Sequence, residues 1–119
     1  MSKGIVSLAP LCAVFALLAA GAVRAEEGMA VHYTDKFQGR PTASGEKFDQ
    51  KALTAAHKKL PFGTQAKVTN LENNQSVTVK INDRMARKNR NVIDVTRAAA
   101  RELGFEKKGR ARVRIDVVQ

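Results

Sequence analysis

Regular alternation of apolar and polar residues constrains the fold of this chain more than any other feature. Residues 76–82 place valine or isoleucine at every second position, and residues 112–117 repeat this pattern. A period of two is typical of β-strands that bury one face. Residues 66–69 are predicted to pair with the first of these strands, because Glu72-Asn73-Asn74 follows them and asparagine tolerates left-handed backbone angles. The chain is therefore expected to consist mainly of short strands.

One α-helix is predicted, over residues 97–103. Thr96 can cap its first turn by accepting hydrogen bonds from free backbone N–H groups, three consecutive alanines favour helix, and Gly104 ends it. A short helical turn over residues 52–57, ended before Pro61, is a second expectation. Many short strands, one or two short helices and no alternation of strands with helices predict a small closed β-barrel.

The first 25 residues have the order of a secretory signal. Lys3 supplies a positive start, an apolar run extends from Ile5 to Val23, and the acidic pair Glu26-Glu27 follows Ala25. The run is short and interrupted for a membrane span. Cys12 lies inside the run, so it is not expected to carry a lipid. We predict a signal peptide over 1–25 and an exported domain over 26–119, soluble in the periplasm or secreted, without stable membrane insertion.

Charge and cysteine content limit the partners and the cofactors of that domain. Removing Lys3 and Arg24 from the 21 Lys and Arg leaves 19 against 11 Asp and Glu, a formal charge of +8. This charge favours an anionic or polar extended polymer, and a cell-wall glycan suits an exported protein better than nucleic acid does. The only cysteine lies in the predicted signal, so the domain must rely on its core. With two histidines and no close ligand spacing, no metal and no cofactor is expected. A monomer is expected.

Four sequence blocks follow one another in a fixed order. They read FQGRPTASGEKFD, LTAAHKKLPFGTQAKVTN, VKINDR and VIDVTRAAARELG. In this order and at these gaps they resemble the rare lipoprotein A (RlpA-like) family, over about residues 28–117. The resemblance implies a six-stranded double-psi β-barrel, shared with expansin and barwin domains. It also implies a lytic transglycosylase that cuts peptidoglycan glycan strands.

The resemblance also implies which residues form the site. The functional acid corresponds to Asp83, and the polar groups that support it correspond to Glu46, Asp49 and His57. We expect Asp83, Glu46 and His57 to act in catalysis and Asp49 to contact the substrate. Two further substrate contacts are expected from the residues themselves. Tyr33 can stack on a sugar face, as can Phe37, and Arg84 opens a basic run over 84–90 that can contact an anionic glycan.

The expected reaction requires a carboxyl group that keeps its proton. This group protonates the leaving oxygen and then accepts the proton of the C6 hydroxyl that attacks C1 of the same muramic acid ring. Asp83 ends an alternating strand, so it can lie at a barrel rim above apolar side chains, where a second acid nearby would help to raise its pKa. Glu46 or Asp49 could be that acid, and His57 could hydrogen-bond one of the carboxylates.

Each of these residues also has an ordinary structural interpretation. Asp83 could open a turn, Glu46 could lie in a solvated turn, His57 could end the turn at 52–57, and Asp49 could cap a helix. Asp94 lies between a strand and the predicted helix, where pairing with Arg97 or the backbone is expected. The remaining large aromatic residues are expected in the core, namely Phe48, Phe62 and Phe105.

Two departures from the family pattern keep a second function open. His32-Tyr33-Thr34 lacks a glycine, and Arg84-Met85-Ala86 stands where the family has Arg-Gly-Pro, so the loop after the acid lacks two residues that would fix its backbone. The alternative function is a non-enzymatic polysaccharide-binding protein of the expansin type. Retention of Glu46, His57 and Asp83 together favours the enzyme, because binding alone does not need a protonatable acid.

Overall fold

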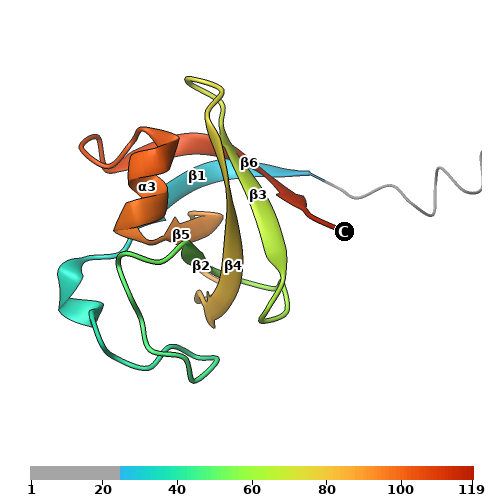
Figure 1. Ribbon diagram of the computed structural model, residues 1–119. Coiled ribbons are helices and arrows are strands. Elements are labelled where there is room, and N and C mark those ends of the chain that lie inside the picture. Colours follow the sequence, from blue (N-terminus) through green and yellow to red (C-terminus); the bar gives the residue numbers. More distant parts are fainter. Residues whose placement is uncertain (1–24) are drawn as a thin grey trace, which may run out of the picture.

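A computed structural model describes residues 25–119 and shows a barrel with one α-helix at its side (Figure 1). The elements are β1 (Glu26–His32), the 3-10 turn η1 (Asp35–Phe37), β2 (Thr54–His57), β3 (Gln65–Asn70), β4 (Ser76–Arg84), β5 (Ile93–Val95), α3 (Arg97–Leu103) and β6 (Arg110–Val117). The strands close in the order β1-β5-β2-β4-β3-β6. The predicted closed six-stranded barrel is confirmed. The predicted signal peptide, apart from Ala25, lies outside the described residues.

The strands follow the alternation of the sequence. β3 and β4 form the predicted antiparallel hairpin, whose turn contains Asn74 with a φ of 64°. Val77, Val79 and Ile81 of β4 point into the barrel, as Val113 and Ile115 of β6 do. Pairs β1–β5 and β2–β4 are parallel, and the other pairs are antiparallel. The alternating apolar residues therefore form one core inside the barrel.

Residues 54–57 are a strand, and the expected helical turn over 52–57 is wrong. β2 lies between β4 and β5 and hydrogen-bonds to both, and all four of its residues are buried. Two small alanines, Ala55 and Ala56, fit this position between two neighbouring backbones. Pairing on both sides supplies more hydrogen bonds than one isolated helical turn could, so tertiary structure overrides the helix preference of alanine.

The predicted helix has the predicted bounds and caps. Thr96 accepts a hydrogen bond from the backbone N–H of Ala99, and Gly104 ends α3 with a φ of 82°. Ala99, Ala100 and Leu103 are buried in the barrel core. Within residues 25–119, no helix has the length and apolar character needed to cross a membrane.

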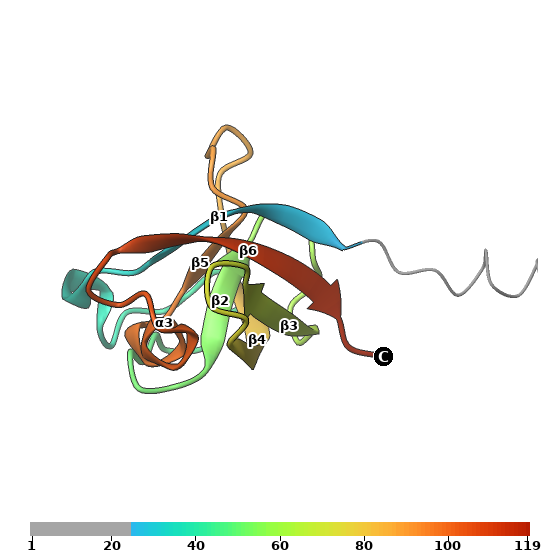
Figure 2. The ribbon, with the colours of Figure 1, turned by 90° about the horizontal axis from the view of Figure 1, so that it is seen from above.

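Two long connections lie outside the barrel wall. Residues 33–53 run from β1 to β2 on the side of the barrel that carries α3 (Figure 1), and residues 85–92, here called the basic loop, project from the barrel (Figure 2). A second apolar cluster lies beneath them and comprises Tyr33, Phe48, Ala56 and Met85, with Phe37 packed against it. The outer face of β2 is therefore covered by aromatic side chains.

The aromatic residues divide between core and surface. Phe48 and Phe105 are buried, as predicted. Phe62 is 43% exposed, so its predicted core position is wrong. It lies in a turn whose next residue, Gly63, has a φ of 92°, and the guanidinium of Arg84 stacks over its ring at 4.4 Å. The turn directs the Phe62 ring away from the barrel, where a cation covers part of it.

Candidate functional site

A β-bulge directs Asp83 away from the barrel core. Ala55 of β2 pairs with Ile81 of β4, but Ala56 pairs with Asp83, so Asn82 is an extra residue in β4. Side chains alternate along a regular strand, so without the bulge Asp83 would face the core together with Ile81. The bulge places Asp83 on the outer face, beside Ala56. Local strand irregularity thus makes this carboxylate available.

Asp94 lies on the same face, on the other side of Ala56. β5 is the antiparallel neighbour of β2, and Ala56 pairs with Asp94. Both neighbours of Asp94 in β5, Ile93 and Val95, are fully buried in the core, which leaves Asp94 pointing outward. Because strands are spaced about 4.8 Å apart, the two aspartate backbones are separated by roughly 10 Å, and their side chains flank one small methyl group.

Three hydrogen-bond donors hold Asp83. Its Oδ1 accepts from the backbone N–H of Ala43 and of Arg84, each at 2.9 Å, and its Oδ2 accepts from the Tyr33 hydroxyl at 2.5 Å. Ala43 belongs to the 33–53 segment, so this carboxylate joins that segment to β4. The bond from the Arg84 backbone resembles the local turn contact that was the structural alternative for Asp83. The other two bonds come from distant parts of the chain.

Asp94 is the carboxyl group of the site that binds a proton more strongly than usual. Burial raises the pKa of Asp94 to about 7, with the nearby Asp83 carboxylate adding to the rise and His32 opposing it. Within residues 25–119, Oδ1 of Asp94 is buried without a hydrogen-bond partner. A buried carboxyl group with no donor is more stable when it is neutral. The site therefore combines Asp94, whose pKa is raised toward neutrality, with an Asp83 that accepts three hydrogen bonds.

Tyr33 serves this pair through its hydroxyl group and not through its ring faces. The ring is only 8% exposed and packs against Phe48 at a centroid distance of 4.3 Å and edge-on against Phe37 at 5.8 Å. The expected stacking of Tyr33 on a sugar is therefore wrong, because its faces are covered. Burial and the hydrogen bond to Asp83 raise the pKa of the Tyr33 phenol far above its usual range, so it remains a donor.

Glu46 lies near Asp83 without contacting it. Its carboxylate accepts from Lys80 Nζ at 2.8 Å and from Asn82 Nδ2 at 3.1 Å, next to the bulge. The hydrogen bond from Lys80, and then that from Asn82, lowers the pKa of Glu46 below its usual range. Glu46 is thus a poor proton donor at neutral pH. It stabilises the bulge that directs Asp83 outward.

His57 contacts none of the three expected carboxylates. Its ring is buried, its Nε2 lies 2.7 Å from a carboxylate oxygen of Glu26, and its Nδ1 accepts from the backbone N–H of Lys59 and Leu60. Both ring nitrogens are therefore occupied. His57 holds the turn after β2 in place and joins it to the start of β1.

Asp49 and Arg84 also have structural contacts. Asp49 accepts from the backbone N–H of Lys51 through Oδ1, a turn contact that the sequence had offered as a cap. The Arg84 guanidinium donates to the carbonyl oxygens of His57 and Leu60 and stacks on Phe62. Arg84 therefore braces the same turn as His57, and its charge is directed away from the Asp83 carboxylate.

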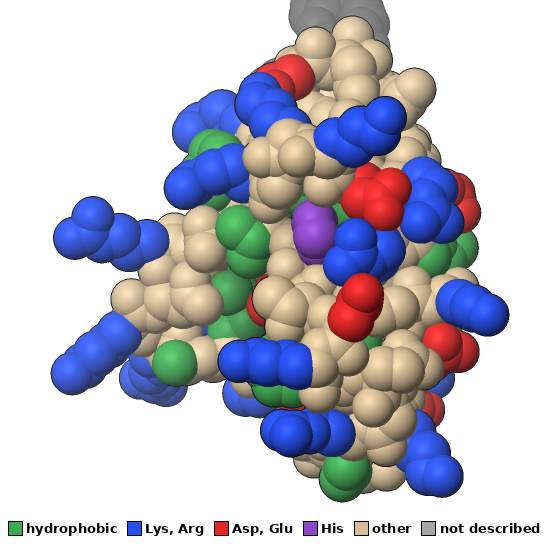
Figure 3. Space-filling view, turned by 90° about the vertical axis from the view of Figure 1, so that its left-hand side faces the viewer, with side chains coloured by type: hydrophobic (Ala, Val, Ile, Leu, Met, Phe, Trp, Pro, Cys, Tyr) green, Lys and Arg blue, Asp and Glu red, His purple; other side chains and the backbone are tan. Residues whose placement is uncertain are grey.

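Positive charge lies in the loop that follows β4, the strand that carries Asp83. Within residues 25–119, the three cations of the basic loop form no ion pair, and the loop begins directly after Arg84. They are Arg87, Lys88 and Arg90, all partly or fully exposed. On the face shown in Figure 3, Lys and Arg side chains stand out along the edges and also lie in the middle, among carboxylates, apolar side chains and a histidine.

Sequence reasoning assigned Asp94 to an ion pair or a backbone contact and so missed its place in the site. The signal was present, because Asp94 is the one polar residue in the apolar triplet Ile93-Asp94-Val95. Such a triplet directs its middle residue to the outer face of a strand. The sequence could not show that Asp94 lies beside Ala56 of β2, because residues 52–57 had been expected to be helical.

The comparisons with known proteins agree with this fold. A sequence model of the family described as lytic transglycolase matches residues 25–115. A Synechocystis protein named probable endolytic peptidoglycan transglycosylase RlpA is 52% identical over 96 residues, covering 81% of this chain and 30% of that protein. The endolytic peptidoglycan transglycosylase RlpA of Haemophilus influenzae is 47% identical over 93 residues, covering 78% and 32%. This chain thus spans about a third of the length of these relatives.

A solved structure shows the same fold at much lower identity. A mutant expansin from Clavibacter michiganensis, in complex with cellohexaose, superposes with a TM-score of 0.65 and 17% identity, covering 81% of this chain and 51% of that one. At this identity the likeness concerns the fold alone. The family match and the identity to the RlpA proteins are the stronger evidence, and by them the chain belongs to the lytic transglycolase family of double-psi β-barrels.

Proposed function

We propose that this domain is a peptidoglycan lytic transglycosylase, which cleaves the bond between MurNAc and GlcNAc in glycan strands and leaves 1,6-anhydro-MurNAc ends. The observation that carries the proposal is the pair of outward-facing carboxyl groups on either side of Ala56. One of them, Asp94, has a pKa raised to about 7. The other, Asp83, accepts hydrogen bonds from the Tyr33 hydroxyl and from two backbone N–H groups. Two acids in different environments suit a reaction that needs both an acid and a base.

In this mechanism Asp94 donates its proton to the glycosidic oxygen as the bond from C1 of MurNAc breaks. Asp83 accepts the proton of the C6 hydroxyl of the same ring, whose oxygen forms the new bond to C1. Its negative charge also stabilises the oxocarbenium-like transition state. No water is consumed, and the two carboxyl groups regain their starting protonation by exchange with solvent. Tyr33 keeps Asp83 in place throughout, because its phenol does not ionise at physiological pH.

The proposal places the domain in the cell envelope, with the glycan strands as its partner. The secretory character of residues 1–25 supports export to the periplasm or the medium. N-terminal sequencing of the exported protein tests this: a start at Glu26 is expected, and a start at Met1 or a lipid on Cys12 contradicts it. The excess of exposed cations suits an anionic polymer.

The activity is tested by digesting purified sacculi and detecting anhydro-muropeptides by mass spectrometry. We expect the wild type to release them and Asp83→Asn and Asp94→Asn to lose roughly 100- to 10,000-fold in rate, the usual contribution of proton transfer. Glu46→Gln should lose less, because Glu46 acts on the bulge. Circular dichroism shows whether each variant is folded.

Binding of sacculi without anhydro-muropeptides from the folded wild type would favour the non-enzymatic alternative. A wild-type rate in Asp83→Asn would exclude Asp83 from the reaction and make Glu46 the next candidate for the base.

A further inference from the structure

The 33–53 segment carries two of the groups that hold Asp83, yet it contains little regular structure. Its regular structure within residues 33–53 consists of the 3-10 turn η1 and one isolated β-bridge, between Pro41 and Lys47. A segment of this length needs other contacts to keep the Tyr33 hydroxyl and the Ala43 N–H in place. Its most buried polar side chain is that of Gln50, which is 9% exposed.

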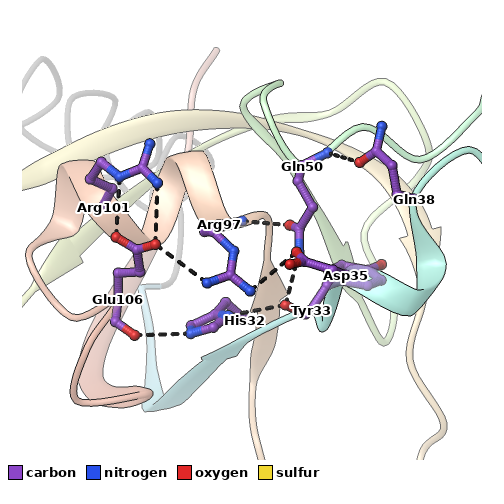
Figure 4. Close-up of polar contacts among 8 residues, drawn as sticks. All are labelled: His32, Tyr33, Asp35, Gln38, Gln50, Arg97, Arg101 and Glu106. Atoms are coloured by element: carbon purple, nitrogen blue, oxygen red, sulfur yellow. Dashed lines mark hydrogen bonds and ion pairs between the residues drawn. The ribbon is translucent and has the colours of Figure 1, made fainter.

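The side-chain amide of Gln50 uses all its hydrogen-bonding groups except one oxygen lone pair. Its Nε2 donates to the carbonyl oxygen of Tyr33 at 3.1 Å and to Asp35 Oδ1 at 2.9 Å, while its Oε1 accepts from the backbone N–H of Arg97 at 2.7 Å (Figure 4). Gln50 thus links the residue after β1 to the first residue of α3. Those two points are remote in sequence and adjacent in the site.

Gln50 also completes the N-terminus of α3. The first four N–H groups of a helix lack partners within the helix. Here Gln50 accepts from the Arg97 N–H with its side chain and from the Ala98 N–H with its backbone carbonyl, the latter at 3.0 Å. The Ala99 N–H donates to the Thr96 hydroxyl, and the N–H of Thr96 itself donates to the Thr54 carbonyl. The start of α3, three residues after Asp94, is therefore fixed to the 33–53 segment.

Further polar contacts surround this link and hold the same backbone. The carbonyl oxygen of Tyr33 also accepts from His32 Nδ1 at 3.0 Å, and the Tyr33 N–H donates to the Val95 carbonyl. Asp35 accepts from the Arg97 guanidinium at 3.1 Å as well as from Gln50. Both peptide groups that flank the Tyr33 α-carbon are therefore fixed, which sets the direction of the phenol toward Asp83.

We propose that Gln50 is a positioning residue of the active site, which holds the Tyr33 hydroxyl on Asp83 and sets the position of Asp94 by joining residue 33 to the start of α3. The inference rests on the proposed function for its catalytic consequence, whereas its structural part can be measured without activity. Gln50 contacts neither carboxylate, so it acts through Tyr33 and the helix.

The chain offers a direct probe of this claim. Tyr33 is the only tyrosine, and there is no tryptophan, so near-ultraviolet absorbance and emission report the environment of this one phenol. The spectrum of Asp83→Asn supplies the reference for a phenol without its carboxylate partner. Gln50→Ala removes all three side-chain bonds. Gln50→Glu keeps an acceptor for Arg97 and loses both donors, which separates the Tyr33 contact from the helix cap.

Asn70→Ala is the matched control. Asn70 is also a buried amide, and it donates to the carbonyl oxygen of Leu103 at the other end of α3 and accepts from the Glu72 N–H. Removing it should lower thermal stability by a similar amount. Because it lies away from Tyr33, it should leave the tyrosine spectrum and the kinetic constants unchanged.

We expect both Gln50 variants to shift the tyrosine spectrum toward that of Asp83→Asn. Their kcat should fall by roughly 10- to 100-fold, the usual effect of misplacing a catalytic group by about 1 Å. KM should change by less than about threefold, since substrate contacts remain. A wild-type spectrum in both folded Gln50 variants would overturn the inference, as would equal changes in Asn70→Ala. If the wild type releases no anhydro ends, the proposed function fails, and the spectra alone decide the role of Gln50.

Discussion

Replacing Asp94 by asparagine should make the protein more stable at alkaline pH while it removes activity. Burial raises the pKa of Asp94 to about 7 in the folded protein, against 3.8 for an unperturbed carboxyl group. Between these two values the folded state binds a proton that the unfolded state has released. Stability therefore falls as pH rises from about 4 to about 7, and the full cost is present above that range.

The magnitude follows from the size of the shift. The pKa values of about 7 and 3.8 differ by about three units, and each unit corresponds to about 1.4 kcal/mol, so the limit is about 4 kcal/mol. Solvent reaches part of this carboxyl group, and we expect about 2–4 kcal/mol. An asparagine of the same shape carries no such cost. Asp94→Asn should therefore gain this amount relative to the wild type between pH 4 and pH 8.

The assay is urea denaturation followed by far-ultraviolet circular dichroism at several pH values for both proteins. The other titrating groups are common to the two proteins, so the difference in unfolding free energy isolates residue 94. Any constant effect of the new amide cancels when the difference at pH 4 is subtracted. A difference that does not change with pH would refute the reasoning, because it would mean that Asp94 titrates alike in the folded and unfolded states.

Three further changes have defined outcomes. Tyr33→Phe should lower the unfolding free energy by ~1–2 kcal/mol, since a hydrogen bond to a carboxylate is lost, and should slow sacculus digestion; unchanged values in both assays would mean that the phenol does not support Asp83. Replacing the three cations of the basic loop by alanine should weaken sacculus pull-down. The wild-type interaction should also weaken as the Debye length falls from ~10 Å at 0.1 M salt to ~3 Å at 1 M; salt-independent binding would show that this charge serves another purpose. Thr96→Ala should cost ~1–2 kcal/mol in urea denaturation, since the cap of α3 is lost, whereas Thr96→Ser keeps the hydroxyl and should stay near the wild type; equal losses would locate the effect in the methyl group.

The sequence by itself determined the parts of the fold that depend on local patterns. Alternation identified the long strands β4 and β6, because a strand with one buried face must repeat every two residues. Thr96 and Gly104 marked the bounds of α3, because a helix leaves free donors at one end and favours a left-handed residue at the other. Four sequence blocks in order indicated the family and the acid at Asp83. The strands and the helix are set by neighbouring residues, and the family is indicated by several motifs in a fixed order, so both can be recognised without knowing which residues meet in space.

The tertiary structure alone decided which side chains meet at the site. Ala56 is paired on both sides only because β2 lies between β4 and β5, and that pairing brings Asp83 and Asp94 to one face. In the closed barrel His57 contacts Glu26 and the Lys59 N–H instead of the expected carboxylates. No local pattern encodes such neighbours, since they come from residues far apart in sequence. The pKa of Asp94 follows from this arrangement, because burial and a second carboxylate exist only once the barrel has closed.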